Sequence, residues 1–196
     1  KFAMPPNKDM IYDRVIKKVP SKNIMYSTRV GGNKYEVAER VGYIWKIEPE
    51  TDKILNHKVQ RATTNNGGRK WTAWFSSEIP VNDGPYKFFG LPGLILKIED
   101  EGKNLVMTLM AVKKMKNTFS YPEFNNYDRL YKTDFNRYRK IFKAYRNDPT
   151  ADMIGKIPDY TDSEGNFRTG DQIIKEEKKW RLINLAKDNN IIEIDL

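Results

Sequence analysis

The sequence predicts an α+β protein that is mostly β: a curved antiparallel meander sheet, open-barrel-like, with two C-terminal helices packed on it. Over residues 24–113, short stretches of alternating polar and apolar residues are separated by turn-forming residues, which is typical of antiparallel strands. After Pro122, aromatic and aliphatic residues recur every three or four positions, which is typical of amphipathic helices. Aromatic residues make up 12% of the chain, enough to fill a strand-rich interior.

Seven strands are expected in the β part of the chain. They cover residues 24–30, 34–40, 41–48, 53–63, 69–77, 94–99 and 104–113. Glycine and asparagine at residues 31–33 and 65–68 predict two hairpin turns, and the proline-containing segment 48–52 predicts another turn. The strand at 104–113 is apolar on both faces, so we expect it in the middle of the sheet, between two layers.

Two helices and a short tail strand are expected after the sheet. The spacing of Tyr, Phe, Leu and Ile predicts a helix over residues 127–146, ended by an Asp-Pro pair. Residues 147–170 are rich in turn formers and are expected to form a long surface loop. A capping box predicts the start of a second helix over residues 169–187, and residues 191–194 predict a short strand.

We expect one domain over residues 1–196. Residues 1–23 are polar and interrupted by prolines, which predicts a loosely ordered N-terminal segment; residues 24–113 form the sheet and residues 114–196 the helical C-terminal part. No apolar run approaches the roughly 20 residues that a membrane-spanning helix needs. The sequence therefore predicts no transmembrane segment.

The formal net charge of the chain is +9, and most of it is concentrated in one segment. Residues 113–146 contain ten basic and three acidic side chains, a difference of +7. On the expected helix, a basic stripe of Lys132, Arg139, Lys143 and Arg146 lies away from the aromatic face. Such a stripe can attract acidic proteins, anionic lipids or nucleic acid, or it can be a solvated face. Because the aromatic residues share one helical face, core packing is favoured over base stacking, and we expect no nucleic-acid partner.

The segment between the strands at 69–77 and 94–99 combines structure breakers with aromatic residues. Its glycines and prolines exclude a helix or a regular strand, while Tyr86, Phe88 and Phe89 supply apolar surface. The segment ends in six residues that we call the signature loop: Gly90, Leu91, Pro92, Gly93, Leu94 and Ile95.

Two interpretations of this segment are open. The glycines and prolines can allow a tight crossing in which apolar side chains fill the core, or the aromatic side chains can present a contact surface. We expect Leu91, Leu94 and Leu96 to be buried and at least one of Phe88 and Phe89 to be exposed. Gly93 is expected to have a positive φ or to allow a close backbone approach.

Several short motifs accompany the signature loop. They are Trp45-Lys46-Ile47, Ala62-Thr63, Trp71-Thr72-Ala73-Trp74, Glu78-Ile79-Pro80 and Gly84-Pro85. Together they resemble the GLPGLI family, whose members are small exported envelope proteins of Bacteroidetes-type bacteria without an established biochemical role. The resemblance covers residues 41–112 and implies a periplasmic or envelope location; the sequence itself shows no signal peptide. Many members carry a cysteine near the position of Val59, so any redox or disulfide role of that cysteine does not transfer to this chain.

Little in the sequence points to an enzyme. His57 is the only histidine and there is no cysteine, which disfavours a zinc site and excludes a Cys nucleophile. Ser76 and Ser77 lack a nucleophile-elbow motif, and the acidic residues at 159–164 do not have EF-hand spacing. We therefore expect no metal and no cofactor. The enzymatic alternative is an envelope hydrolase that uses His57 with carboxylates.

The leading expectation is a non-enzymatic accessory protein of the periplasm or cell envelope that binds another protein or an apolar ligand. Such a protein can be a subunit of an outer-membrane complex. The candidate partner-binding residues are Tyr86, Phe88, Phe89, Lys132, Arg139, Lys143 and Arg146. If both phenylalanines are fully buried, the signature loop is a structural plug and the basic stripe becomes the leading surface. The alternatives are the hydrolase and a basic protein that binds anionic lipid or nucleic acid.

Overall fold

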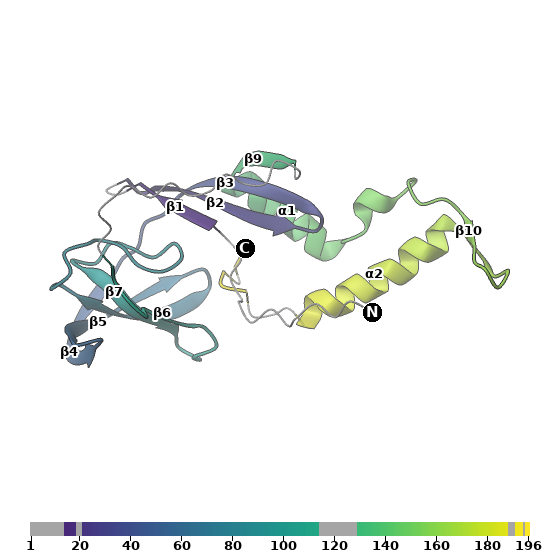
Figure 1. Ribbon diagram of the computed structural model, residues 1–196. Coiled ribbons are helices and arrows are strands. Elements are labelled where there is room, and N and C mark those ends of the chain that lie inside the picture. Colours follow the sequence, from purple (N-terminus) through teal and green to yellow (C-terminus); the bar gives the residue numbers. More distant parts are fainter. Residues whose placement is uncertain (1–13, 19–20, 114–128, 188–190, 194) are drawn as a thin grey trace.

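Most of the strands lie in two open sheets, a small two-stranded hairpin follows the first helix, and the helices lie toward the C-terminal end (Figure 1). The computed structural model describes residues 14–18, 21–113, 129–187, 191–193 and 195–196. Within this part of the chain the predicted fold class is confirmed: the protein is mostly β, its sheets are chiefly antiparallel and not closed into a barrel, and two helices follow. The predicted N-terminal segment lies outside the described residues up to residue 13, and a strand begins at Arg14.

The larger sheet is the predicted antiparallel meander, with its strands in sequence order. The strands are β4 (Lys46–Ile54), β5 (His57–Asn66), β6 (Arg69–Ser76), β7 (Leu94–Asp100) and β8 (Val106–Thr108). The predicted hairpin between β5 and β6 is confirmed, because Gly67 and Gly68 make the turn with φ angles of 61° and 73°.

The turn predicted at residues 48–52 is wrong. β4 continues through this segment, and the turn lies at Leu55 and Asn56, whose φ angles are 48° and 65°. Pro49 is tolerated inside the strand because β4 is an edge strand, where a missing N–H does not break a central ladder. The pairing of β4 with β5 also shifts its register between Ile47 and Thr51, the segment that contains Pro49.

The strand predicted at 104–113 is also different in the structure. Only Val106–Thr108 pair with β7, and β8 is the edge of the sheet, not its middle. Its apolar side chains therefore do not lie between two layers, and Val106 is 49% exposed.

The smaller sheet joins strands from distant parts of the chain. Its order is β1 (Arg14–Lys17), β2 (Asn23–Val30), β3 (Asn33–Arg40) and β9 (Leu130–Asp134). β1, β2 and β3 are antiparallel, which confirms the predicted hairpin over residues 24–40, whereas β9 pairs with β3 in parallel. The first part of the helix predicted over 127–146 is thus a strand, and residues 127–128 lie outside the described residues.

Helix α1 (Phe135–Asn147) begins directly after β9. The carboxylate of Asp134 caps it by accepting the Arg137 N–H at 3.0 Å. One face of α1 packs on the smaller sheet, where the rings of Tyr26 and Tyr138 meet edge to face with centroids 5.9 Å apart. Among the described elements, α1 therefore covers one face of this sheet and leaves the other face open.

The predicted surface loop after α1 contains a 3-10 turn, η1 (Ala151–Met153), and a small hairpin of β10 (Tyr160–Thr161) and β11 (Phe167–Arg168). Helix α2 (Gly170–Lys187) begins at the predicted capping box: the Thr169 N–H donates to Gln172 Oε1 at 2.9 Å, and the Gln172 N–H donates to Thr169 Oγ1 at 3.3 Å.

The strand predicted at residues 191–194 does not form in residues 191–193, and residue 194 lies outside the described part. The C-terminus instead lies between the two sheets (Figure 1).

Each sheet has its own apolar core. The core of the larger sheet contains Ala62, Trp71, Ala73, Phe75, Phe88, Leu91, Ile95, Ile98 and Leu105. The core of the smaller sheet contains Ile24, Tyr26, Val30, Val37, Val41 and Tyr138. Tyr43 packs against both cores and so connects them.

Candidate functional site

The aromatic side chains before the signature loop fill the interior of the protein. Phe88 is 1% exposed, and its ring centroid lies 4.8 Å from that of Trp71 and 5.3 Å from that of Tyr43. Phe89 and Tyr86 are half-buried, and the carbonyl of Phe89 accepts the Trp45 Nε1–H at 2.9 Å. The expectation that Phe88 or Phe89 is exposed is therefore wrong, because both rings pack around Tyr43.

In the signature loop the backbone passes close to the end of β6 before it enters β7. Leu91 and Leu96 are buried as predicted, whereas Leu94 is only half-buried. Gly93 has a φ of 151°, and a Cβ on it would lie 2.1 Å from the Ser76 carbonyl oxygen. Both expected reasons for a glycine at this position, a positive φ and a close backbone approach, are confirmed.

The most unusual group in this region is Lys87, a lysine that is 1% exposed. Its Nζ donates to Glu39 Oε2 at 2.7 Å and to Glu193 Oε1 and Oε2 at 2.8 and 3.0 Å. Nζ also lies 3.9 Å from the centroid of the Tyr26 ring, within range of a cation–π contact. Burial raises the pKa of the Glu39 carboxyl, while the charge of Lys87 opposes this effect.

Sequence reasoning missed this ion-pair cluster. A weak signal was present, because Lys87 stands between Tyr86 and Phe88 and Glu193 stands next to Ile191 and Ile192. A lone charge in an apolar segment that becomes buried requires a partner of opposite charge. The sequence gives no means of pairing two such residues that are 106 positions apart.

A second buried ion pair lies on the larger sheet. Arg69 Nη1 donates to Asp100 Oδ2 at 2.8 Å, and only 5% of the Asp100 side chain is exposed. Burial disfavours the charged form of Asp100, but the Leu105 N–H, Asn104 and Arg69 together hold its pKa below the usual range. The other side of the Arg69 guanidinium, Nη2, donates to the Ile191 carbonyl at 2.8 Å.

Asp100→Asn is expected to lower the free energy of unfolding by about 1–3 kcal/mol at neutral pH, because Arg69 loses a charged acceptor. Since folding lowers the pKa of Asp100, its stabilising effect is present above the ordinary value of 3.8 and is lost as the pH falls through the lowered value. Denaturant titrations of both proteins should therefore converge only at pH values well below 3.8. Curves that stay equally far apart at acidic pH would contradict this assignment.

The basic stripe predicted on one helix is divided in the structure. Lys132 lies on β9 and pairs with Glu36 of β3 at 3.8 Å. Arg139 and Arg146 lie on α1 and donate to backbone carbonyls, of Asp195 at 2.9 Å and of Leu185 at 3.0 Å. Lys143 is an exposed residue of the same helix. Since α1 packs on the opposite face of the sheet, Lys132 does not share a surface with the other three.

The open face of the smaller sheet carries an apolar row that crosses three strands. Ile16 of β1 pairs with Met25 of β2, and Met25 pairs with Ala38 of β3. We call this row, with the side chains beside it, the outer face. Ile16 is 36% exposed and Met25 38%.

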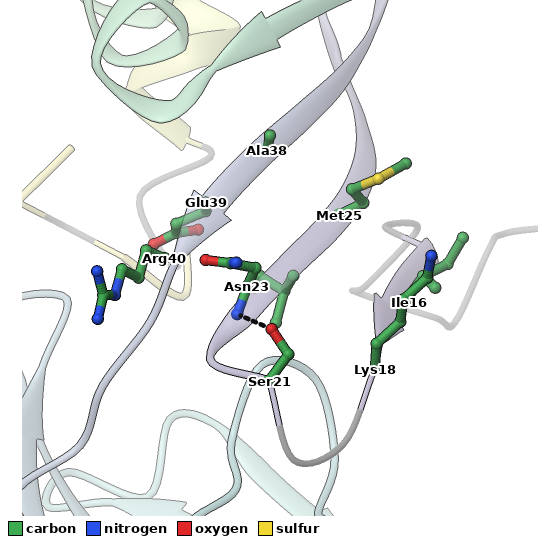
Figure 2. A pocket seen from close by; sticks show the side chains of 9 residues that line it. Ile16, Lys18, Ser21, Asn23, Met25, Ala38, Glu39 and Arg40 are labelled. Atoms are coloured by element: carbon green, nitrogen blue, oxygen red, sulfur yellow. Dashed lines mark hydrogen bonds between the residues drawn. The ribbon is translucent and has the colours of Figure 1, made fainter.

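The outer face is hollowed at one end by a depression of about 510 Å³ (Figure 2). Its lining residues are Ile16, Lys18, Ser21, Asn23, Ile24, Met25, Ala38, Glu39 and Arg40. Lys18 and Arg40 place positive charge beside the apolar row, whereas Lys132, on the same side of the sheet, is paired with Glu36. The arrangement offers an apolar contact bordered by cations.

His57 lies at the end of the larger sheet rather than in a cleft with several carboxylates. Its Nδ1 is 2.9 Å from Glu78 Oε2, and this hydrogen bond lowers the pKa of Glu78. The neighbouring depression has about 310 Å³ and is lined by Ser77 and Glu78, among others. The hydroxyl of Ser76 donates to the Lys58 carbonyl at 2.8 Å and is thus engaged away from His57.

Within the described ranges, no group of three or more His, Asp or Glu side chains is placed to hold a metal ion. None of the helices in that part of the chain is long and apolar enough to cross a membrane.

Comparison with known proteins gives a family match and a fold match. A family model described as "Protein of unknown function (Porph_ging)" matches residues 67–97, within the region that carries the GLPGLI resemblance. A search of curated proteins finds no match. Among solved structures, the chain is similar to PNGF-II in space group C2, with 20% identity and a TM-score of 0.51 over 70% of this chain. PNGF-II in space group P21 gives 16% identity and a TM-score of 0.48 over 79% of this chain.

The chain corresponds to 26% and 29% of these two PNGF-II chains. The likeness to the first of them shows a shared fold, which in PNGF-II is part of a longer chain.

Proposed function

We propose that this chain is a non-enzymatic binding module of a bacterial cell envelope and that it binds a partner protein through the outer face of its smaller sheet. The observation that carries the proposal is the exposed row of Ile16, Met25 and Ala38. α1 covers the opposite face of this sheet, so the exposed row is not needed for the core of the chain. Apolar rows bordered by polar residues are typical of protein-binding surfaces.

The partner segment that fits this face has an apolar side chain flanked by carboxylates. Lys18 and Arg40 border the depression, and the whole chain has a formal net charge of +9. A basic surface of this kind speeds the encounter with an acidic partner and makes binding sensitive to salt.

The envelope location in this proposal rests on the sequence motifs that resemble the GLPGLI family, and an outer-membrane protein complex is the class of partner that such a location favours.

The competing function is an envelope hydrolase, and the hydrogen bond between His57 and Glu78 is the observation that favours it. A base oriented by a carboxylate is one part of such a site. The pair is open to water, however, and the side chains of His57 and Glu78 are 37% and 50% exposed. The outer face therefore supports the binding function better.

Met25→Glu is expected to abolish capture of the partner while leaving stability within about 0.5 kcal/mol of the wild type, because the site is on the surface. A carboxylate at the centre of the row removes the apolar contact and repels an acidic segment. The measurement is co-purification from native envelopes, followed by calorimetric titration with the purified partner.

Met110→Glu is the matched control, because Met110 is 85% exposed and lies after β8 on the other sheet. It should capture the partner as the wild type does. Equal capture by Met25→Glu and the wild type would remove the outer face from the proposal. A chain that recovers no partner but hydrolyses a substrate, with loss of activity in His57→Ala, would establish the competing function.

A further inference from the structure

One face of the larger sheet carries polar side chains around a single tryptophan, and we call it the polar face. Residues that pair directly across antiparallel strands point to the same side of a sheet, so the register defines this face. It contains two rows that cross β5, β6 and β7: Arg61, Trp74 and Lys97, then Thr63, Thr72 and Glu99. The apolar core of the sheet and the loop of residues 77–93 lie on the opposite side (Figure 1).

Trp74 is the aromatic centre of the polar face, and its side chain is half-buried. Trp45 and Trp71 donate their indole N–H groups to backbone carbonyls, those of Phe89 and Asn66. Within the described residues, the indole N–H of Trp74 has no such acceptor. A flat apolar ring with a free donor at its edge can therefore serve a ligand.

Each cation beside Trp74 has a carboxylate next to it. Lys97 Nζ lies 2.9 Å from Glu99 Oε2. The Arg61 guanidinium pairs with Glu48 and, at 3.3 Å, with Glu50. Because these charges are matched in pairs, the polar face does not favour a ligand of either net charge. It offers donors and acceptors side by side, which suits a ligand rich in hydroxyl groups, since each hydroxyl both donates and accepts.

The spacing of these groups matches a sugar ring. Adjacent strands lie about 4.8 Å apart, so Arg61 and Lys97 flank Trp74 at that distance on either side. A pyranose ring laid on the indole brings the hydroxyls of its rim over the two flanking ion pairs. In β-1,4-linked glucose units all ring substituents are equatorial, so both ring faces carry only C–H groups and the chain is a flat ribbon. Such a C–H face packs well on the negative face of an aromatic ring.

We propose that the polar face is a second binding site, which takes a neutral β-1,4-linked sugar chain with one ring stacked on Trp74. A sugar is the occupant that fits, because its hydroxyls replace the water around the ion pairs. An apolar segment would remove that water and give nothing in return. With a single stacking ring the site is weak, and we expect a Kd of about 1 mM.

The test follows the indole N–H signals of the four tryptophans by NMR while cellohexaose or chitohexaose is added to the full chain. We expect a saturable shift of the Trp74 signal with at least one of these sugars, while the signals of Trp45 and Trp71 stay in place. Maltohexaose is the matched ligand, because its glucose units are joined by α-1,4 bonds into a curved chain. It should bind about tenfold more weakly. An equal response to maltohexaose would overturn the assignment of the linkage.

Variants tie the response to the ring. Trp74→Ala should weaken binding at least about tenfold, measured through the backbone amide of Lys97, and Trp74→Phe should retain much of it because it keeps an aromatic face. The same spectra show whether each variant is folded. Trp180→Ala is the matched control, since Trp180 is 62% exposed but lies on α2, and it should bind as the wild type does.

Two results would overturn the proposal. One is a Trp74 signal that neither cellohexaose nor chitohexaose moves at about 10 mM, even if a peptide does move it. The other is binding that survives in Trp74→Ala. Met25→Glu, on the other sheet, should bind the sugar as the wild type does, so this outcome is independent of the proposed partner binding.

Discussion

Lys87→Met is expected to lower the free energy of unfolding by about 3–5 kcal/mol, because it leaves two buried carboxylates without their cation. The side chains of Glu39 and Glu193 are only 12% and 8% exposed, so water cannot replace the lost ammonium group. Methionine is similar in length to the lysine stem and keeps the packing beside Tyr26, so the loss reports the missing charge and not a cavity. Denaturant unfolding near neutral pH measures it.

The matched control removes all three charges together. Lys87→Met combined with Glu39→Gln and Glu193→Gln should recover much of the lost stability, since a neutral cluster has no uncompensated buried charge. A loss below about 1 kcal/mol in Lys87→Met alone would mean that the carboxylates reach water and that the cluster is not a structural link.

The effect of this substitution should also depend on pH. Burial raises the pKa of Glu39 above its ordinary value of 4.5, against the attraction of Lys87. The folded chain thus holds this proton more tightly than the unfolded chain, so the contribution of Glu39 to stability is fully present below the ordinary value and is lost as the pH rises through the raised one. Without the Lys87 cation the pKa rises further, and the deficit of Lys87→Met should shrink as the pH is lowered to about 5.

Local sequence patterns predict the turns and helix starts, because these depend on residues that are close together in the chain. Glycines at residues 31–32 and 67–68 specify two hairpins, and the Thr169–Gln172 capping box marks the start of α2. The predictions are wrong where pairing with a strand distant in the sequence decides whether a segment is a helix or a strand. Leu130–Asp134 has aromatic and aliphatic spacing that suits a helix, but pairing with β3 makes it a strand.

The candidate site was less predictable than the fold. A row such as Ile16, Met25 and Ala38 depends on the register between strands, and no short-range pattern fixes that register. The charge of Lys132 is evident in the sequence, but its position on the outer face follows from strand β9, which the helical spacing of residues 127–146 does not predict. Phe88 was ambiguous because an aromatic residue in a glycine-rich loop can fill a core or face a partner.

Gly93→Ala is the second substitution with a large expected effect, a loss on the order of 4 kcal/mol in the free energy of unfolding, at the upper end for single substitutions. The new Cβ would lie 2.1 Å from the Ser76 carbonyl oxygen and 2.6 Å from its carbonyl carbon. Both atoms belong to the backbone, so no side-chain rotation relieves the contact. The φ of 151° adds strain that an L-residue with a Cβ avoids.

The clash is costly because of where it falls in the fold. Ser76 pairs with Leu94 and Phe75 with Ile95, so separating the two backbones at Gly93 opens the β6–β7 ladder at its buried end. Gly42→Ala is the matched control, since a Cβ at Gly42 meets nothing within 4 Å; it should change stability by about 0.5 kcal/mol or less. Denaturant unfolding of the two variants side by side makes the comparison. A Gly93→Ala loss as small as that of the control would mean that the crossing of the signature loop can open without disturbing the core, which the buried Leu91 and Ile95 argue against.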